Sequence, residues 1–161
     1  IFEFNDVTVK DVMTEKRKVY FVNENMKKEE IYKIVKKSGF TRFPVLNDND
    51  QVVGILNVKD LIVNRTDKFD LKVHIRKPIN LKSNMIIDDA FLLLNSKREG
   101  MAIVIDENKE FVGVVTLEDI LESVVGNIFD EYDKTGSDVV EFDGKSGSDL
   151  ITGKNKDNEI I

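Results

Sequence analysis

The chain repeats itself: residues 22–62 align without gaps on residues 81–121, an offset of 59 positions. Identical pairs across the two copies include Asn25/Asn84, Met26/Met85, Val45/Val104, Asn49/Asn108, Val53/Val112, Gly54/Gly113 and Asp60/Asp119. One copy spans about 55 residues, which is marginal for a domain that must bury its own core. We therefore expect two copies to pack sheet to sheet around a pseudo-twofold axis.

Each copy has the same predicted order of elements, strand–helix–strand–strand–helix, which indicates an α+β fold. The segments KKEEIYKIVKKS and IIDDAFLLLNSK have helical apolar spacing and carry acids in their first turn. The strands FPVLN and AIVID lead through polar turns into the strands VVGIL and FVGVV. The clearest predicted helix is 117–129, where apolar residues recur at i, i+3, i+4 and i+7.

Composition excludes several classes of function. The 161 residues carry a net charge of −6, which argues against nucleic acid as a partner because such binding depends on Lys and Arg. There is no cysteine, so disulfides, thiolate metal sites and cysteine nucleophiles are excluded. The lone His74 is expected to be a partly buried linker residue. Because the sequence begins with IFEFNDV and not with Met, we interpret it as a fragment whose intact protein continues upstream of Ile1.

The stretch GVVTLED, residues 113–119, allows two interpretations that are compatible with each other. Thr116 and Asp119 have the spacing of a helix capping box. Gly113 removes a side chain from the preceding strand, so that a ligand or another backbone segment can approach closely. A carboxylate beside a helix N-terminus could then accept hydrogen bonds from the two hydroxyls of a ribose. In the first copy, Asn57 and Asp60 occupy the equivalent positions.

The two copies differ in the residues that could complete such a site. The first copy has Phe40-Thr41-Arg42-Phe43-Pro44, and the second has Glu99-Gly100-Met101-Ala102-Ile103 at the equivalent places. Arg42 could pair with phosphate, or it could form an ordinary surface ion pair. Phe40 and Pro44 could contact a purine, although Phe40 and Phe43 could equally be core residues. The sequence therefore predicts one well-formed site, which contains Thr116 and not Asn57.

These motifs resemble a tandem pair of CBS domains, the Bateman module. The stretches VTVKDVMT, KKSGFTRFPVL and GVVTLEDILESVVGNIFDEYD are similar to the cytosolic part of CorC/HlyC/CNNM haemolysin-like proteins, which are linked to magnesium and cobalt transport. The resemblance predicts an N-terminal linker at 1–8, CBS repeats at 9–66 and 67–129, and an acidic linker with a truncated C-terminal segment at 130–161.

The resemblance also implies a site and its ligand. It implies that an adenine nucleotide, ATP or AMP, is clasped between the two repeats, with magnesium bridging its phosphates. Carried over by motif, the nucleotide-binding residues are Thr14, Phe40, Arg42, Pro44, Thr116 and Asp119. No catalytic residue and no protein ligand to a metal is implied. This chain departs from the family at Glu15, where proline is usual, and at Phe40, where tyrosine is common.

We therefore expect a non-enzymatic regulatory module, forming a homodimer, in the cytoplasmic domain of an integral membrane protein. It would pass nucleotide occupancy to an upstream membrane domain. One alternative is a purely structural dimerisation module with an empty, degenerate site. A weaker alternative is a direct magnesium sensor that uses acidic residues such as Asp130, Glu131 and Asp133. The segment from Lys134 onward is rich in Gly, Ser and Asp and is expected to be a linker.

Overall fold

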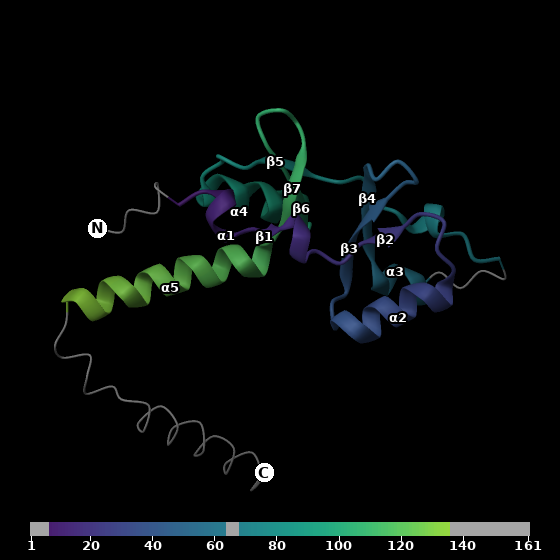
Figure 1. Ribbon diagram of the computed structural model, residues 1–161. Helices are drawn as coiled ribbons and strands as arrows, with labels where there is room; N and C mark the ends of the chain where they lie inside the picture. The colour runs from purple at the N-terminus through teal and green to yellow at the C-terminus, as the bar shows by residue number, and fades with distance from the viewer. Residues whose placement is uncertain (1–6, 64–67, 136–161) are drawn as a thin grey trace, which may run out of the picture. The chain divides into compact units, whose positions relative to one another are not determined.

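The computed structural model describes residues 7–63 and 68–135 and contains two sheets with their helices (Figure 1). The first repeat forms β2 (Val22–Asn23), α2 (Lys28–Ser38), β3 (Arg42–Leu46), β4 (Val52–Asn57) and α3 (Val58–Val63). The second repeat forms β5 (Asn80–Lys82), α4 (Ile87–Lys97), β6 (Met101–Ile105), β7 (Phe111–Thr116) and α5 (Leu117–Thr135). The predicted α+β class and the predicted order of elements in both repeats are confirmed.

The last helix is longer than the sequence pattern predicted. Residues 3–122 form one compact unit, and α5 continues from it to Thr135, whereas the apolar pattern predicted an end at Phe129. No glycine or proline stands between residues 127 and 135, so nothing in the sequence stops the helix there. The backbone of Asp130, Glu131 and Asp133 is thus helical, while their side chains and all of residues 136–161 lie outside the described part of the chain.

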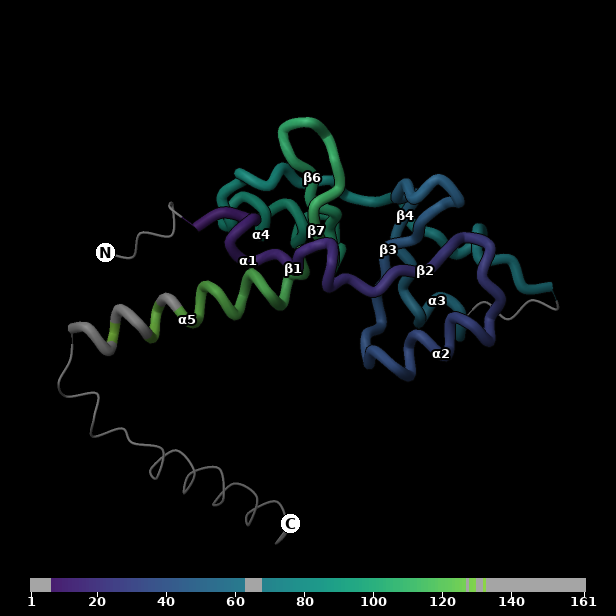
Figure 2. The backbone as a smooth tube through the Cα atoms, viewed as in Figure 1, coloured from purple at the N-terminus to yellow at the C-terminus, as the bar shows by residue number. Residues whose placement is uncertain are grey.

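The two sheets exchange segments between the repeats. The three-stranded sheet has the order β2-β3-β4, and the four-stranded sheet has the order β1-β7-β6-β5. Strand β1 (Thr14–Glu15) precedes β2 in sequence but pairs antiparallel with β7 of the second repeat, with Thr14 opposite Val114. Figure 2 shows the chain passing from β1 at one sheet to β2 at the other. The short helix α1 (Val9–Val12) also precedes β2 in sequence and also contacts the second repeat, since the amide of Val9 donates to the carbonyl of Met85 at 2.8 Å.

Hydrophobic packing joins the repeats as well as filling each one. In the first repeat, Ile31 of α2 and Leu61 of α3 pack with Phe43 and Leu56 of the sheet, and all four side chains are buried. A second buried cluster draws on both repeats and contains Ile55, Met101, Ile103 and Val114. Because neither repeat alone supplies this second cluster, the repeats stabilise each other, as the short length of one repeat predicted.

The histidine lies in the connection between the repeats. His74 ends the short 3-10 helix η3 (Leu71–His74), its side chain is 7% exposed, and its ring stacks on Phe69 at a centroid distance of 6.5 Å. His74 lies between the repeats as predicted, but it is buried and not partly buried.

Two glycines permit the exchange of segments. A Cβ atom added at Gly113 would collide with the carbonyl oxygen of Thr14 and would lie 2.9 Å from Sδ of Met13. A Cβ atom added at Gly54 would collide with the side chain of Ile75 and would lie 2.5 Å from the carbonyl oxygen of Arg76. Of the two reasons proposed for Gly113, the close approach of another backbone segment is therefore the one that the structure shows.

We predict that Gly113→Ala destabilises the module by about 1–3 kcal/mol, the usual cost of adding volume where the neighbours cannot move. The neighbour here is the backbone of β1, which is fixed by its pairing with β7. Urea unfolding followed by circular dichroism measures the change. Gly126→Ala is the control, because nothing lies within 4 Å of a Cβ atom at that helical position. A Gly113→Ala protein as stable as the control would contradict this role for the glycine.

Candidate functional site

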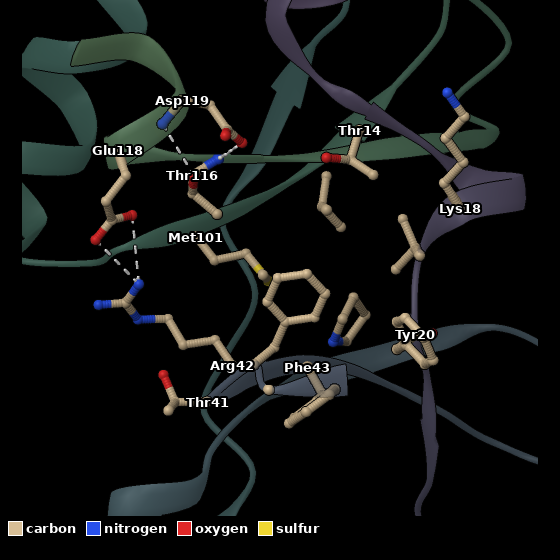
Figure 3. A pocket seen from close by; sticks show the side chains of 15 residues that line it. Thr14, Lys18, Tyr20, Thr41, Arg42, Phe43, Met101, Thr116, Glu118 and Asp119 are labelled. Atoms are coloured by element: carbon tan, nitrogen blue, oxygen red, sulfur yellow. Dashed lines mark hydrogen bonds and ion pairs between the residues drawn. The ribbon is translucent and has the colours of Figure 1, made fainter. Parts of the chain in front are cut away.

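A cavity of about 370 Å³ lies within the 3–122 unit and is lined from both repeats (Figure 3). This volume falls in the range of small-molecule sites. The lining residues are Thr14, Lys18, Val19, Tyr20, Gly39, Phe40, Thr41, Arg42, Phe43, Pro44, Met101, Val114, Thr116, Glu118 and Asp119. All six residues that the sequence singled out are among them. They come from the crossing segment at β1, the start of β3, and the junction of β7 with α5.

The capping box at the start of α5 forms as predicted. The amide of Asp119 donates to Oγ1 of Thr116 at 3.1 Å, and the amide of Thr116 donates to Oδ2 of Asp119 at 3.2 Å. In the first repeat, Oδ1 of Asn57 accepts from the amide of Lys59 at 3.1 Å. Both repeats are therefore capped, and capping explains why the pattern occurs twice.

Capping also changes what the start of α5 can bind. The amide of Leu117 donates to the carbonyl of Gly100 at 2.9 Å, so this amide and that of Asp119 are already used. Glu118 and Asp119 add negative charge in the first turn. The helix N-terminus is thus a poor anion site. A carboxylate has more acceptor positions than one amide bond uses, however, so Asp119 retains capacity for hydroxyl donors.

Arg42 of the first repeat forms a long ion pair with Glu118 of the second. Nη1 of Arg42 lies 3.4 Å from Oε1 and 3.5 Å from Oε2 of Glu118. The side chain of Arg42 is 31% exposed and that of Glu118 is 60% exposed. A long ion pair with one partner this exposed contributes little to stability. The surface ion pair expected as one alternative for Arg42 is present, and the weakness of the pair leaves the guanidinium able to change partners.

The guanidinium of Arg42 lies against a glycine of the other repeat. A Cβ atom added at Gly100 would lie 2.7 Å from Nε of Arg42, so a side chain there would require the guanidinium to move. The equivalent residue of the first repeat is Thr41. Gly100 of the second repeat therefore positions Arg42 of the first. In the sequence, only the comparison of the two repeats could have indicated this role of Gly100.

An exposed aromatic pair forms the opposite side of the cavity. The rings of Tyr20 and Phe40 have centroids 6.0 Å apart at an angle of 57°, and their exposed fractions are 39% and 56%. Phe43 is fully buried in the first repeat's core. Core packing thus explains Phe43 but not Phe40. Two exposed rings beside the buried Pro44 offer flat apolar surface to a planar ligand.

Sequence reasoning missed several lining residues, among them Lys18, Tyr20 and Glu118. Lys18 belongs to the basic run of η2 (Lys16–Lys18), and Glu118 sits inside the motif that was singled out, so both had a visible signal. Glu15, whose negative charge departs from the family pattern, is not a lining residue. Its carboxylate accepts from Nε of Arg17 at 2.7 Å, and this bond holds the pKa of Glu15 below its ordinary value.

Two further properties bear on the class of site. Among the side chains that the structure describes, which do not include those of Asp130, Glu131 and Asp133, no group of three or more His, Asp or Glu is arranged to hold a metal ion. In the same part of the chain, every helix is too short or too polar to span a bilayer.

The sequence model of the CBS domain matches residues 9–66 and 70–126. The chain belongs to the CBS domain family. It is 36% identical over 142 residues to the UPF0053 protein YrkA of Bacillus subtilis, across 83% of this chain and 33% of that protein. It is 33% identical over 138 residues to the magnesium and cobalt efflux protein CorC of Pasteurella multocida, across 83% of this chain and 46% of that protein.

A solved structure agrees with these relatives. The CBS domain of the bacterial CNNM/CorC family Mg²⁺ transporter, in complex with ATP, superposes with a TM-score of 0.71 at 26% identity, covering 77% of this chain and 91% of that one. The predicted resemblance to a tandem CBS pair of the CorC type is confirmed. The CBS module spans one third to one half of the length of the curated relatives just named.

We predict that Gly100→Ala displaces the guanidinium of Arg42 with a change of less than about 1 kcal/mol in the free energy of unfolding, because a flexible side-chain end can move away at small cost. The ¹⁵Nε resonance of Arg42 in NMR spectra reports the displacement, and urea unfolding reports the stability. An unmoved resonance, or a loss of stability as large as that of Gly113→Ala, would contradict the positioning role of Gly100.

Proposed function

We propose that this CBS module is a regulatory adenine-nucleotide-binding unit of a CorC-type membrane ion transport protein. The observation that carries the proposal is the cavity, which brings an exposed aromatic pair, two cations and the carboxylate of a helix-capping residue together from both repeats. The related CBS domain whose structure was solved in complex with ATP supports the choice of ligand. In this proposal the module senses the nucleotide and catalyses no reaction.

Each part of a nucleotide has a chemically matched partner in the cavity. Asp119 would accept from the ribose hydroxyls, with the hydroxyls of Thr116 and Thr14 beside it. The rings of Tyr20 and Phe40 would contact the base. The guanidinium of Arg42 would pair with phosphate oxygens once it leaves Glu118, and Pro44, which also lines the cavity, would contact the base.

Charge decides how the phosphates are accommodated. Lys18 and Arg42 contribute two positive charges to the lining, and Glu118 and Asp119 contribute two negative charges. The lining is therefore neutral overall, and a triphosphate would add several negative charges near Glu118. Magnesium bridging the phosphates would offset this repulsion. We accordingly expect the affinity for ATP to depend on magnesium more strongly than the affinity for AMP.

Regulation follows from the place of the cavity between the repeats. A ligand shifts a conformational equilibrium only when it binds one arrangement better than another. A nucleotide that contacts Thr14 on one side and Asp119 on the other would favour the arrangement in which β1 lies against β7. Because the chain spans only one third to one half of the length of its relatives, we propose that occupancy is passed to a membrane domain in the rest of the protein and that the module is cytoplasmic.

The competing hypothesis is a dimerisation module whose cavity stays empty. The ion pair between Arg42 and Glu118 favours it, because the phosphate-binding cation is already partnered. The exposed Phe40 and Tyr20 oppose it, because a structural module has no need of uncovered rings in a cavity. The homodimer itself is part of both hypotheses.

We predict that ATP, ADP or AMP, with and without magnesium, raises the melting temperature of the protein. Ligand at a hundredfold excess over its dissociation constant stabilises by about 2.7 kcal/mol. For a chain of this size, that corresponds to a shift of roughly 5–10 °C. Differential scanning fluorimetry measures the shift, and magnesium alone serves as a separate arm for the magnesium-sensor alternative. The proposal fails if no nucleotide shifts the melt at millimolar concentration.

Asp119→Ala should abolish most of that shift while costing about 1 kcal/mol of intrinsic stability as a lost cap. Asp11→Ala is the matched control, because Oδ2 of Asp11 accepts from the amide of Thr8 at 2.9 Å in the same kind of cap, away from the cavity. Equal nucleotide shifts in the two variants would show that Asp119 is a capping residue only.

We predict that the protein is a homodimer whose contact includes one face of α5. Leu121, Val125 and Phe129 recur at four-residue spacing and are 44%, 47% and 62% exposed in the single chain. Val125→Glu should convert the dimer to a monomer in size-exclusion chromatography with light scattering. Val73→Glu, at an exposed valine outside the helices α2–α5, should leave the dimer intact. A dimer that survives Val125→Glu would place the contact elsewhere.

A further inference from the structure

The 59-residue alignment of the repeats gives the lining residues of the cavity a set of counterparts in the chain, and we call the position of Asn57, Asp60, Arg76 and Glu99 the second cleft. In the first cleft, Thr14 lies opposite Val114, and its carbonyl faces Gly113. In the second, Arg76 pairs with Ile55 through two backbone hydrogen bonds of 2.9 Å, and its carbonyl faces Gly54. Because Ile55 and Gly54 align with Val114 and Gly113 at the 59-residue offset, Arg76 is the structural counterpart of Thr14.

This counterpart carries a guanidinium where the first cleft has a hydroxyl. Nε of Arg76 donates to Oδ2 of Asp60 at 2.8 Å, and its Nη2 donates to Oδ1 at 2.8 Å. Both carboxylate oxygens of Asp60 are therefore occupied by one bidentate ion pair. Glu99 adds a second acid at 3.8 Å from Nη1 of Arg76.

The contrast with the first cleft is one of geometry. There, Oδ2 of Asp119 accepts a single backbone bond, and the nearby Arg42 is held only by long contacts of 3.4 and 3.5 Å to Glu118. A ribose could approach Asp119 without breaking an ion pair. To reach Asp60, it would have to displace two short charge-assisted bonds.

The remaining residues of the second cleft do not compensate for this loss. Asn57 replaces Thr116, Glu99 stands in place of Phe40, and Met101 stands in place of Arg42. An incoming phosphate would meet the carboxylate of Glu99 without the counterpart of Arg42. Met101 belongs to the buried cluster shared by the two repeats, and its uncharged side chain cannot pair with a phosphate as Arg42 can.

We infer that Arg76 closes the second cleft by occupying Asp60, so that each chain presents a single nucleotide site. Arg76 thus acts together with Asn57, Glu99 and Met101 in keeping a nucleotide away from Asp60. The same residue joins α3 of the first repeat to Glu99 of the second through charge. This inference rests on the proposed function for the first cleft, but the state of Asp60 can be measured without any nucleotide.

Isothermal titration calorimetry with ATP and with AMP, each with and without magnesium, tests the inference through stoichiometry and through a matched pair of substitutions. We expect one nucleotide per chain in the wild-type protein. Asp119→Asn should lower the affinity at least tenfold, and Asp60→Asn should change it less than threefold. Binding of two nucleotides per chain, or an equal loss of affinity in the two variants, would overturn the inference.

A nucleotide-free measurement keeps this test separate from the proposed function. The hydrogen bond from Arg76 lowers the pKa of Asp60, so its carboxylate should titrate in NMR spectra below the ordinary value of about 3.9. Stability linked to Asp60 is then present above about pH 4 and is lost as the pH falls through the lowered pKa. Arg76→Gln should return the pKa toward its ordinary value. An ordinary pKa for Asp60 in the wild-type protein would overturn the clamp by Arg76.

The two failures are distinguishable. If the wild-type protein binds no nucleotide but Asp60 titrates low and recovers in Arg76→Gln, the proposed function fails while the clamp by Arg76 stands. If one nucleotide binds and Asp60 titrates at its ordinary pKa, the proposed function stands and the inference about Arg76 fails. Arg76→Gln also serves if Asp60→Asn does not fold, because it frees Asp60 without removing a carboxylate. In that variant, nucleotide affinity at the first cleft should be unchanged, and a tenfold loss would overturn the inference.

Discussion

The site depends on the close crossing of a connecting segment over a glycine of the opposite repeat. At Gly113, the backbone of Thr14 lies so near that a methyl group would collide with it. This approach allows β1 to join the second repeat's sheet, although β1 lies within the sequence of the first repeat. Without it, Thr14 would not reach the junction of β7 with α5, and Lys18 and Tyr20 would lose their place beside the cavity. The cavity therefore depends on the pairing of β1 with the second repeat's sheet as much as on the similarity of the two repeats.

Local patterns in the sequence were sufficient to predict the repeats, their elements and both helix caps. Periodicity and capping act over a few residues, so the printed sequence contains them. The six proposed site residues line one cavity because the first repeat supplies Phe40–Pro44 and the second supplies Thr116 and Asp119. The unequal contributions of the two repeats were predictable because aligned positions in the sequence carry different side chains, with Arg42 opposite Met101 and Thr116 opposite Asn57.

What the sequence did not reveal are contacts between residues far apart in the chain. The pairing of β1 with β7 joins positions a hundred residues apart, and no periodicity in either strand predicts the partner. The same holds for Arg42, whose ion pair with Glu118 and contact with Gly100 cross between the repeats. The extension of α5 beyond Phe129 was missed for another reason, since acidic residues were interpreted as a loop when their helix propensity allowed either state.

The two clefts show how one scaffold can hold equivalent carboxylates in different states. Asp60 and Asp119 occupy the same position in their repeats, each in the first turn of a capped helix that follows a strand. The difference lies in the crossing segment, which presents Arg76 to one and Thr14 to the other. A bidentate guanidinium occupies both oxygens of a carboxylate with charge-assisted hydrogen bonds, whereas a hydroxyl nearby leaves most of its acceptor capacity free. Gly54 and Gly113 allow a crossing segment to approach closely in both clefts. The side chain on that segment, Arg76 or Thr14, therefore determines whether the aspartate is held in an ion pair or can accept hydrogen bonds from a ligand.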